Sequence, residues 1–201
     1  MGSKLLTVAF SLFCLMYLTT CTHKWIAYPQ GVPEYEKCNA WEDDIQMLKV
    51  PGFKLSYIVV QNCYSVPREK VSIALMVFLD EWEKHHSKFS YEKVEAQINE
   101  LLIEFNNKTK LVNAYKHDGT YVQNAKAFGL AMTPGFIWVK MRPNQLLCES
   151  SLVHELIHVG IWANKKTDGD PDHLGNVYSG WDQTKELVMQ ATNKRLCELG
   201  I

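Results

Sequence analysis

The residues of this chain best suited to chemistry are His154, Glu155 and His158. In a helix, two histidines four residues apart lie on the same face, so both imidazole rings can reach one metal ion. Imidazole nitrogen is a common zinc ligand, and a carboxylate beside the first histidine can accept a proton from a water molecule near the metal. The pattern H-E-x-x-H therefore predicts a zinc site with an acid–base residue beside it. The alternative is a pair of core histidines that bond to backbone carbonyls.

The sequence around these histidines predicts the helix that this chemistry requires. Asn144 or Ser150 can cap the start of the helix, and apolar residues recur behind it at helical spacing. The apolar positions are Leu152, Leu156, Val159 and Ala163, with Val153, Ile157, Ile161 and Trp162 widening the apolar surface. We therefore expect this helix to be buried on most of its sides.

A third ligand is expected in the loop that follows the helix. Gly169 and Pro171 turn the chain, so the segment behind them can fold back toward the histidines. Catalytic zinc usually has three protein ligands and keeps a fourth position open, and His173 is the predicted third ligand. Asp170 or Asp172 is available to hydrogen-bond a ligand ring. A flanking aspartate as the third ligand, a calcium loop and a plain surface loop remain as alternatives.

With these residues the chain resembles the zincins, a class of zinc metallopeptidases. The shared features are the H-E-x-x-H motif and the distant His173, at a spacing similar to that of the SprT-like zincins. The resemblance implies an α+β, zincin-like fold, in which a small mixed sheet packs on helices and the active-site helix carries the motif. It also implies one Zn²⁺ held by His154, His158 and His173. Peptide bonds of a peptide or protein substrate would be hydrolysed by a zinc-bound water that Glu155 activates.

Two other classes of function stay open. The first is a metal-binding envelope lipoprotein without catalysis, and the second is a non-enzymatic envelope protein whose histidines are structural. The metal content of the purified protein separates these two from each other, and a Glu155 variant separates both from an enzyme.

Two further features are expected near the substrate. Residues 135–141 read as a strand just before the helix, and in a zincin such a strand forms the edge of the cleft, to which an extended peptide can add. A central buried strand without substrate contact is the alternative. Tyr178 can donate a hydrogen bond to a developing oxyanion, and Trp181 can line a pocket, although ordinary packing roles fit both aromatic residues.

Residues 1–20 resemble an export signal. Lys4 supplies a positive charge, and the apolar run behind it is shorter than a comfortable membrane span. The run ends in Leu-Thr-Thr-Cys at residues 18–21, which resembles a bacterial lipoprotein box and predicts lipidation of Cys21. The protein would then be exported and lipid-anchored in the cell envelope, with residues 21–35 as a tether or N-terminal arm. A cleaved signal with a secreted or periplasmic soluble product and an uncleaved signal anchor are the alternatives.

Export also bears on the remaining cysteines, because oxidising compartments favour disulfides. Four cysteines lie beyond the signal and the lipidation candidate: Cys38, Cys63, Cys148 and Cys197. Four cysteines allow three pairings. We favour Cys38 with Cys63, which closes a local loop, and Cys148 with Cys197, which ties the entry of the motif helix to the C-terminal helix.

The length of the chain predicts a single domain at residues 36–201, and its charge indicates which partners to expect. About 180 residues remain after the signal, enough for one sizeable core. The net charge is −1 at pH 7, and no long basic run is present, so we expect no nucleic-acid partner. The periodicity of the rest of the chain predicts helices at 68–85, from 90 through 105, and at 183–199, and strands at 54–61, 110–115, 121–132 and 135–141.

Overall fold

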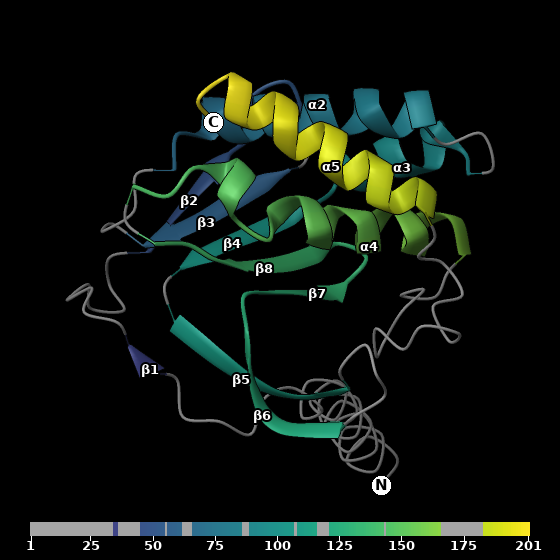
Figure 1. Ribbon diagram of the computed structural model, residues 1–201. Helices are drawn as coiled ribbons and strands as arrows, with labels where there is room; N and C mark the ends of the chain where they lie inside the picture. Colours follow the sequence, from purple (N-terminus) through teal and green to yellow (C-terminus); the bar gives the residue numbers. More distant parts are fainter. Residues whose placement is uncertain are drawn as a thin grey trace, which may run out of the picture.

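The computed structural model describes residues 34–35, 45–54, 56–61, 66–85, 89–106, 108–115, 121–142, 144–165 and 183–201. In these ranges the helices lie together on one face of an open sheet, and a smaller sheet lies on the other side (Figure 1). This arrangement is α+β with a small mixed sheet packed on helices, as the sequence predicted. The signal, the tether and the lipidation candidate Cys21 fall outside the described residues.

The larger sheet has the strand order β2-β3-β4-β8-β7. Its strands are β2 (Ile45–Lys49), β3 (Tyr57–Gln61), β4 (Leu102–Asn106), β8 (Phe136–Lys140) and β7 (Gly129–Thr133). The central strands β3, β4 and β8 run parallel, whereas β2 and β7 pair antiparallel at the two ends. Successive side chains of a strand point to opposite faces of the sheet, so every second residue faces the helices. Ile103, Phe105, Ile137 and Val139 accordingly belong to the core under the helices.

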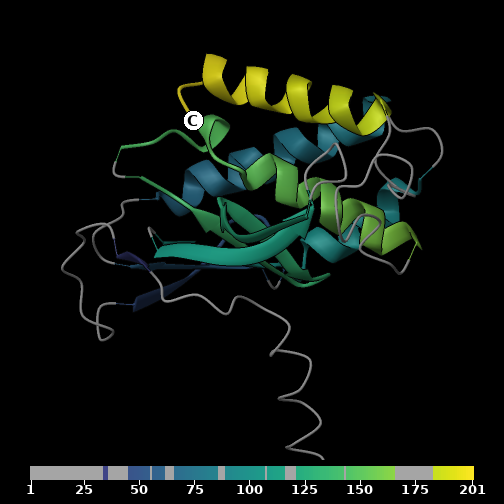
Figure 2. The ribbon, with the colours of Figure 1, turned by 60° about the horizontal axis from the view of Figure 1, so that its bottom comes forward.

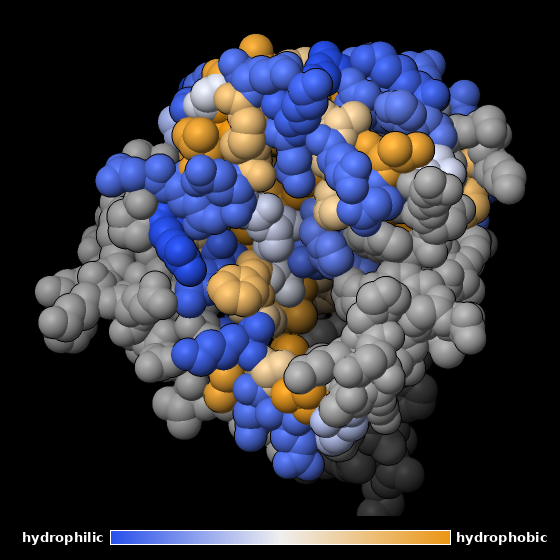
Figure 3. Space-filling view, viewed as in Figure 1, coloured by the Kyte–Doolittle hydropathy of each residue, from blue (hydrophilic) through white to orange (hydrophobic). Residues whose placement is uncertain are grey.

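Helices cover the core-facing side of this sheet. They are α2 (Arg68–His85), α3 (Tyr91–Ile98), α4 (Leu152–Lys165) and α5 (Gln183–Glu198), and the short 3-10 helix η2 (Leu147–Glu149) precedes α4. Helix α5 lies outermost and packs on α2 and α4 (Figure 2). Its outer side is mostly hydrophilic with scattered apolar side chains (Figure 3). No helix in the described ranges is both long and apolar enough to cross a membrane.

The smaller sheet has the order β1-β5-β6, formed by β1 (Glu34–Tyr35), β5 (Lys108–Tyr115) and β6 (Tyr121–Ala127). The predicted single strand at 121–132 is therefore two strands. Strand β6 belongs to the small sheet and β7 to the large one, with Phe128 between them. One continuous stretch of chain thus passes from one sheet to the other.

The prediction of a helix from 90 through 105 was wrong in its second half. Helix α3 ends at Ile98, and a turn at Asn99 and Glu100 leads into β4. Leu101, Leu102 and Phe105 fit helical spacing, but the buried residues are Leu101, Ile103 and Phe105, which alternate as in a strand. Two parallel neighbours, β3 and β8, complete the hydrogen bonds of this segment. Pairing with distant strands therefore overrides local periodicity here.

The cleft-edge role predicted for residues 135–141 was also wrong. Strand β8 lies between β4 and β7, which matches the alternative of a central strand. In the described part of the sheet, β7 is the strand at this edge, and both β7 and β8 contact α4. The sequence could not rank the two strands, because both are apolar and they are joined by a tight turn.

Candidate metal centre

Helix α4 carries the H-E-x-x-H residues, as predicted. The helix begins at Leu152, whose backbone N–H donates to Ser150 Oγ at 3.2 Å, so Ser150, of the two residues considered, is the one that bonds to the start of the helix. The apolar surface is buried: Leu152, Val153, Leu156, Ile157, Val159 and Ile161 are fully covered. The position of α4 in the core is therefore fixed on several sides before any ligand is considered.

The two histidine rings converge on one point. Nε2 of His154 and Nε2 of His158 lie 3.2 Å apart, with the rings nearly perpendicular at 71°. Two nitrogens that each bind a tetrahedral zinc ion at 2.0–2.1 Å are separated by about 3.3 Å. The spacing of the two ring nitrogens thus fits a shared zinc ion. His158 is 6 % exposed, so a metal at this point would be partly shielded from bulk water.

Glu155 lies against the edge strand β7. Only 4 % of the residue is exposed. Burial raises the pKa of the Glu155 carboxyl to about 8, and a hydrogen bond from the backbone N–H of Ala131 in β7 works against that rise. Burial therefore favours the neutral form of this carboxyl more than water does.

The remaining predicted site residues cannot be placed. His173, Asp170, Asp172, Tyr178 and Trp181 all lie outside the described residues. Within the ranges that are described, no group of three or more His, Cys, Asp or Glu side chains is arranged to hold a metal ion. The structure therefore brings together two candidate ligands and the candidate base, and the third ligand stays a prediction.

Two residues near Glu155 were missed by sequence reasoning. Gly129 of β7 approaches α4 so closely that a Cβ atom there would lie under 3.0 Å from Glu155 Oε1 and Ser151 Oγ. The Ser151 hydroxyl donates to the carbonyl of Phe128 at 2.6 Å, which joins the start of α4 to the start of β7. The only signal in the sequence was a glycine inside an apolar strand, which often marks a close backbone approach.

A disulfide lies just before the motif helix. Cys148 of η2 is bonded to Cys197 of α5, with the two Cα atoms 5.4 Å apart. This confirms one of the two favoured pairings, whereas Cys38 and Cys63 fall outside the described residues. The backbone N–H of Cys148 also donates to the carbonyl of the C-terminal residue Ile201 at 3.1 Å. The entry to α4 is thus tied to the end of the chain by a covalent bond and a hydrogen bond.

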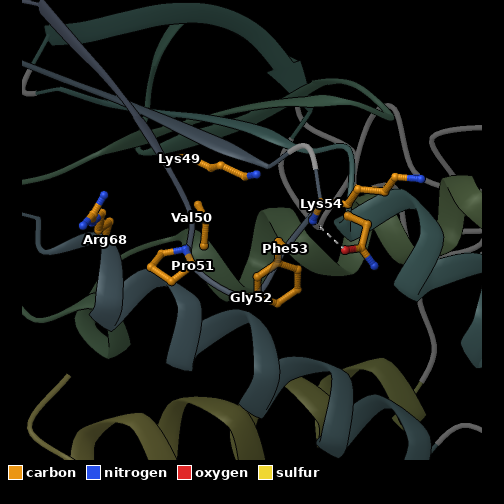
Figure 4. Close-up of a pocket in the computed structure, with 8 residues that line it drawn as sticks. Lys49, Val50, Pro51, Gly52, Phe53, Lys54 and Arg68 are labelled. Atoms are coloured by element: carbon orange, nitrogen blue, oxygen red, sulfur yellow. Dashed lines mark hydrogen bonds between the residues drawn. The ribbon is translucent and has the colours of Figure 1, made fainter.

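A separate hollow of about 570 Å³ lies at the turn between β2 and β3 (Figure 4). Lys49, Lys54 and Arg68 make it basic, and the backbone N–H of Lys54 donates to Asn99 Oδ1 at 3.1 Å. None of its lining residues comes from α4 or β7, so this hollow is not part of the candidate metal centre.

Comparison of the chain with protein-family models, with curated proteins and with solved structures gave no match.

Proposed function

We propose that this protein is a zinc-dependent metallopeptidase with a zincin-like fold, in which His154, His158 and His173 hold one Zn²⁺ and Glu155 is the general base. The observation that supports the proposal most is the 3.2 Å separation of the two histidine Nε2 atoms on a helix that also carries a buried glutamate. This separation also matches the spacing of two nitrogens bound to one tetrahedral zinc ion.

Each residue has a distinct part in the proposed reaction. A bound zinc ion would act as a Lewis acid toward the attacking water and the scissile carbonyl. Glu155 accepts the proton of the attacking water and later passes it to the leaving amine. The carboxyl is buried against β7, which shields it from bulk water. Tyr178 is the candidate donor to the oxyanion, and Asp170 or Asp172 the candidate partner of a ligand ring.

An extended peptide is the substrate that the neighbouring strand favours. Strand β7 lies at one end of the described sheet and contacts α4. An extended chain can add to such an edge through backbone hydrogen bonds, which depend little on side-chain identity. The export-like N-terminus supports a reaction in the cell envelope, with a lipid anchor at Cys21 and a secreted or periplasmic soluble form as the alternative.

The decisive experiment compares the wild-type protein with Glu155→Gln. The variant keeps the zinc ligands and the shape of the side chain but loses the base, so it should bind one zinc per chain and hydrolyse no peptide. Zinc is measured by elemental analysis, and hydrolysis by mass spectrometry of a peptide mixture. Loss of zinc in the variant would contradict the assigned role. Zinc binding with no hydrolysis by the wild type would favour the non-catalytic metal-binding lipoprotein.

The third ligand is tested by zinc titration of three variants. His173→Ala should weaken zinc binding strongly, and Asp170→Ala and Asp172→Ala modestly, because partners of a ligand ring change affinity about 10–100-fold and a ligand changes it more. Normal zinc binding by His173→Ala, together with a loss in one aspartate variant, would show a carboxylate ligand instead.

A further inference from the structure

Strand β7 comes close to helix α4 at Gly129. A methyl group on this residue would lie under 3.0 Å from Glu155 Oε1 and from Ser151 Oγ. The space that a side chain would occupy at position 129 is therefore the space that the Glu155 carboxylate uses. We infer that Gly129 is a positioning residue, whose missing side chain lets β7 hold the Glu155 carboxylate in one place.

Two hydrogen bonds support this assignment from the strand side. The backbone N–H of Ala131, two residues along β7, bonds to the Glu155 carboxylate. The Ser151 hydroxyl, one turn before Glu155 on the helix side, donates to the carbonyl of Phe128 at 2.6 Å. Gly129 lies between the two attachment points. The strand thus bonds to the carboxylate through the Ala131 backbone, and the absence of a side chain at Gly129 leaves the space that the carboxylate occupies.

The identity of the neighbouring atoms decides what a substitution would change. Glu155 Oε1 and Ser151 Oγ are the ends of side chains that can rotate, whereas backbone atoms or a packed ring could not move aside. A methyl group at position 129 is therefore expected to displace the carboxylate and leave the fold intact. A displacement of about 1 Å at a reacting group can lower turnover about 100-fold.

The inference rests on the proposed function, since it assigns a position to the base of that reaction. The position of the Glu155 carboxylate and its hydrogen bond to the Ala131 amide can be measured whether or not the protein is an enzyme. A readout at the Ala131 amide therefore separates failure of the inference from failure of the proposed function.

The test compares Gly129→Ala with the wild type and with Gly135→Ala. Gly135 lies in the turn between β7 and β8, and a Cβ atom there would be 3.8 Å from its nearest neighbour, so this variant is a matched control. Gly129→Ala should bind one zinc ion, unfold within a few degrees of the wild type, and lose about 100-fold in kcat with a much smaller change in KM. Gly135→Ala should match the wild type in all four measurements.

Hydrogen exchange of the Ala131 amide, followed by NMR, gives the readout that does not depend on activity. Gly129→Ala should exchange this amide faster than the wild type and as fast as Glu155→Ala, which lacks the carboxylate. Wild-type exchange at Ala131 together with wild-type kcat in Gly129→Ala would overturn the inference. If the wild type hydrolyses no peptide, the proposed function fails, and the exchange rates still decide the position of the carboxylate.

A double variant covers the case in which Gly129→Ala does not fold. Glu155→Asp shortens the side chain and vacates space near position 129, so Gly129→Ala should cost less in that background than in the wild type. Equal effects of Gly129→Ala on the unfolding midpoint in the two backgrounds would contradict a contact between the two positions.

Discussion

Two glycines, Gly129 of β7 and Gly160 of α4, leave no room for a methyl group, and they differ in what fills the space. A Cβ atom on Gly160 would lie 2.5 Å from Cη2 of Trp82, a fully buried side chain. The Trp82 ring is packed between Phe78 and Phe89, with ring centroids 5.6 and 6.4 Å away. Gly129 instead faces the ends of two polar side chains. The side of α4 that faces the other helices (the helix side) therefore limits how the core packs. The side that faces β7 (the strand side) limits where the Glu155 carboxyl lies.

The helix side is reinforced by contacts from α5. The disulfide from Cys197 holds the entry of α4, and Arg195 donates to both Asp80 and Glu81 of α2. On the strand side the described links are the hydrogen bonds from Ala131 and Ser151. Opening the disulfide or filling the space beside Gly160 should thus change the free energy of unfolding more than a substitution at the contact with β7.

Removal of the disulfide should have the largest effect on stability. Cys148→Ser with Cys197→Ser opens a link between residues 49 apart, for which chain entropy predicts a loss of about 4 kcal/mol. Chemical denaturation of the double variant, beside the wild type under non-reducing conditions, measures the difference. Zinc bound per folded chain should not change, since neither cysteine is a ligand. A loss below about 1 kcal/mol would mean that α5 holds the entry of α4 without the bond.

Gly160→Ala should have the next largest effect, about 1–3 kcal/mol of destabilisation, because overpacking against Trp82 forces a ring in the core to move. Alanine is the better helix former by about 1 kcal/mol, so a net loss requires the clash to outweigh this gain. Gly135→Ala serves as the control and should stay within about 0.5 kcal/mol of the wild type. An unchanged or stabilised Gly160→Ala would show that Trp82 can move aside, and the contrast between the two glycines would not hold.

Ser151→Ala should have a smaller effect, about 0.5–1.5 kcal/mol, since it removes one hydrogen bond to the Phe128 carbonyl. The same substitution at Ser150 removes the cap of α4 without touching β7, and serves as the matched control. Only Ser151→Ala should speed hydrogen exchange in β7. Equal exchange in the two variants would mean that the Ser151 hydroxyl does not hold the strand.

Arg195→Met should have the smallest effect, because Asp80 and Arg195 are partly exposed and water screens their attraction. Hydrogen bonds from Arg195 and then Lys84 lower the pKa of Asp80; for Glu81, burial raises the pKa, but bonds from the same two cations outweigh it. A carboxyl whose pKa is lowered in the folded protein stabilises the fold at a pH above its ordinary pKa, which is 3.8 for Asp80 and 4.5 for Glu81. This stabilisation is lost as the pH falls and the carboxyl takes up a proton. The deficit of Arg195→Met should therefore be full at pH 7 and shrink below pH 4, as measured by denaturation at both values. A deficit independent of pH would point to lost packing instead.

The sequence by itself determined the features that depend on neighbours in the chain. Two histidines four residues apart must share a helix face, so the convergence of His154 and His158 needed only the helix. The bounds of α2 and the buried apolar surface of α4 followed from periodicity. The sequence also favours the pairing of Cys148 with Cys197, one of three possible arrangements, and the structure contains this bond.

Tertiary structure alone decided the features that join distant segments. Residues 102–106 form a strand because β3 and β8 complete their hydrogen bonds, and β7 takes the edge because β8 is already paired on both sides. Gly129 and Glu155 lie close together although they are 26 positions apart in the chain (155 − 129 = 26), and no local pattern in the sequence predicts this contact. Spacing along the chain determines which side chains lie on the same face of a helix. Packing between helices and strands determines which strand backbone that face contacts. The candidate ligands could therefore be predicted from the sequence, and the approach of Gly129 to the Glu155 carboxyl could not.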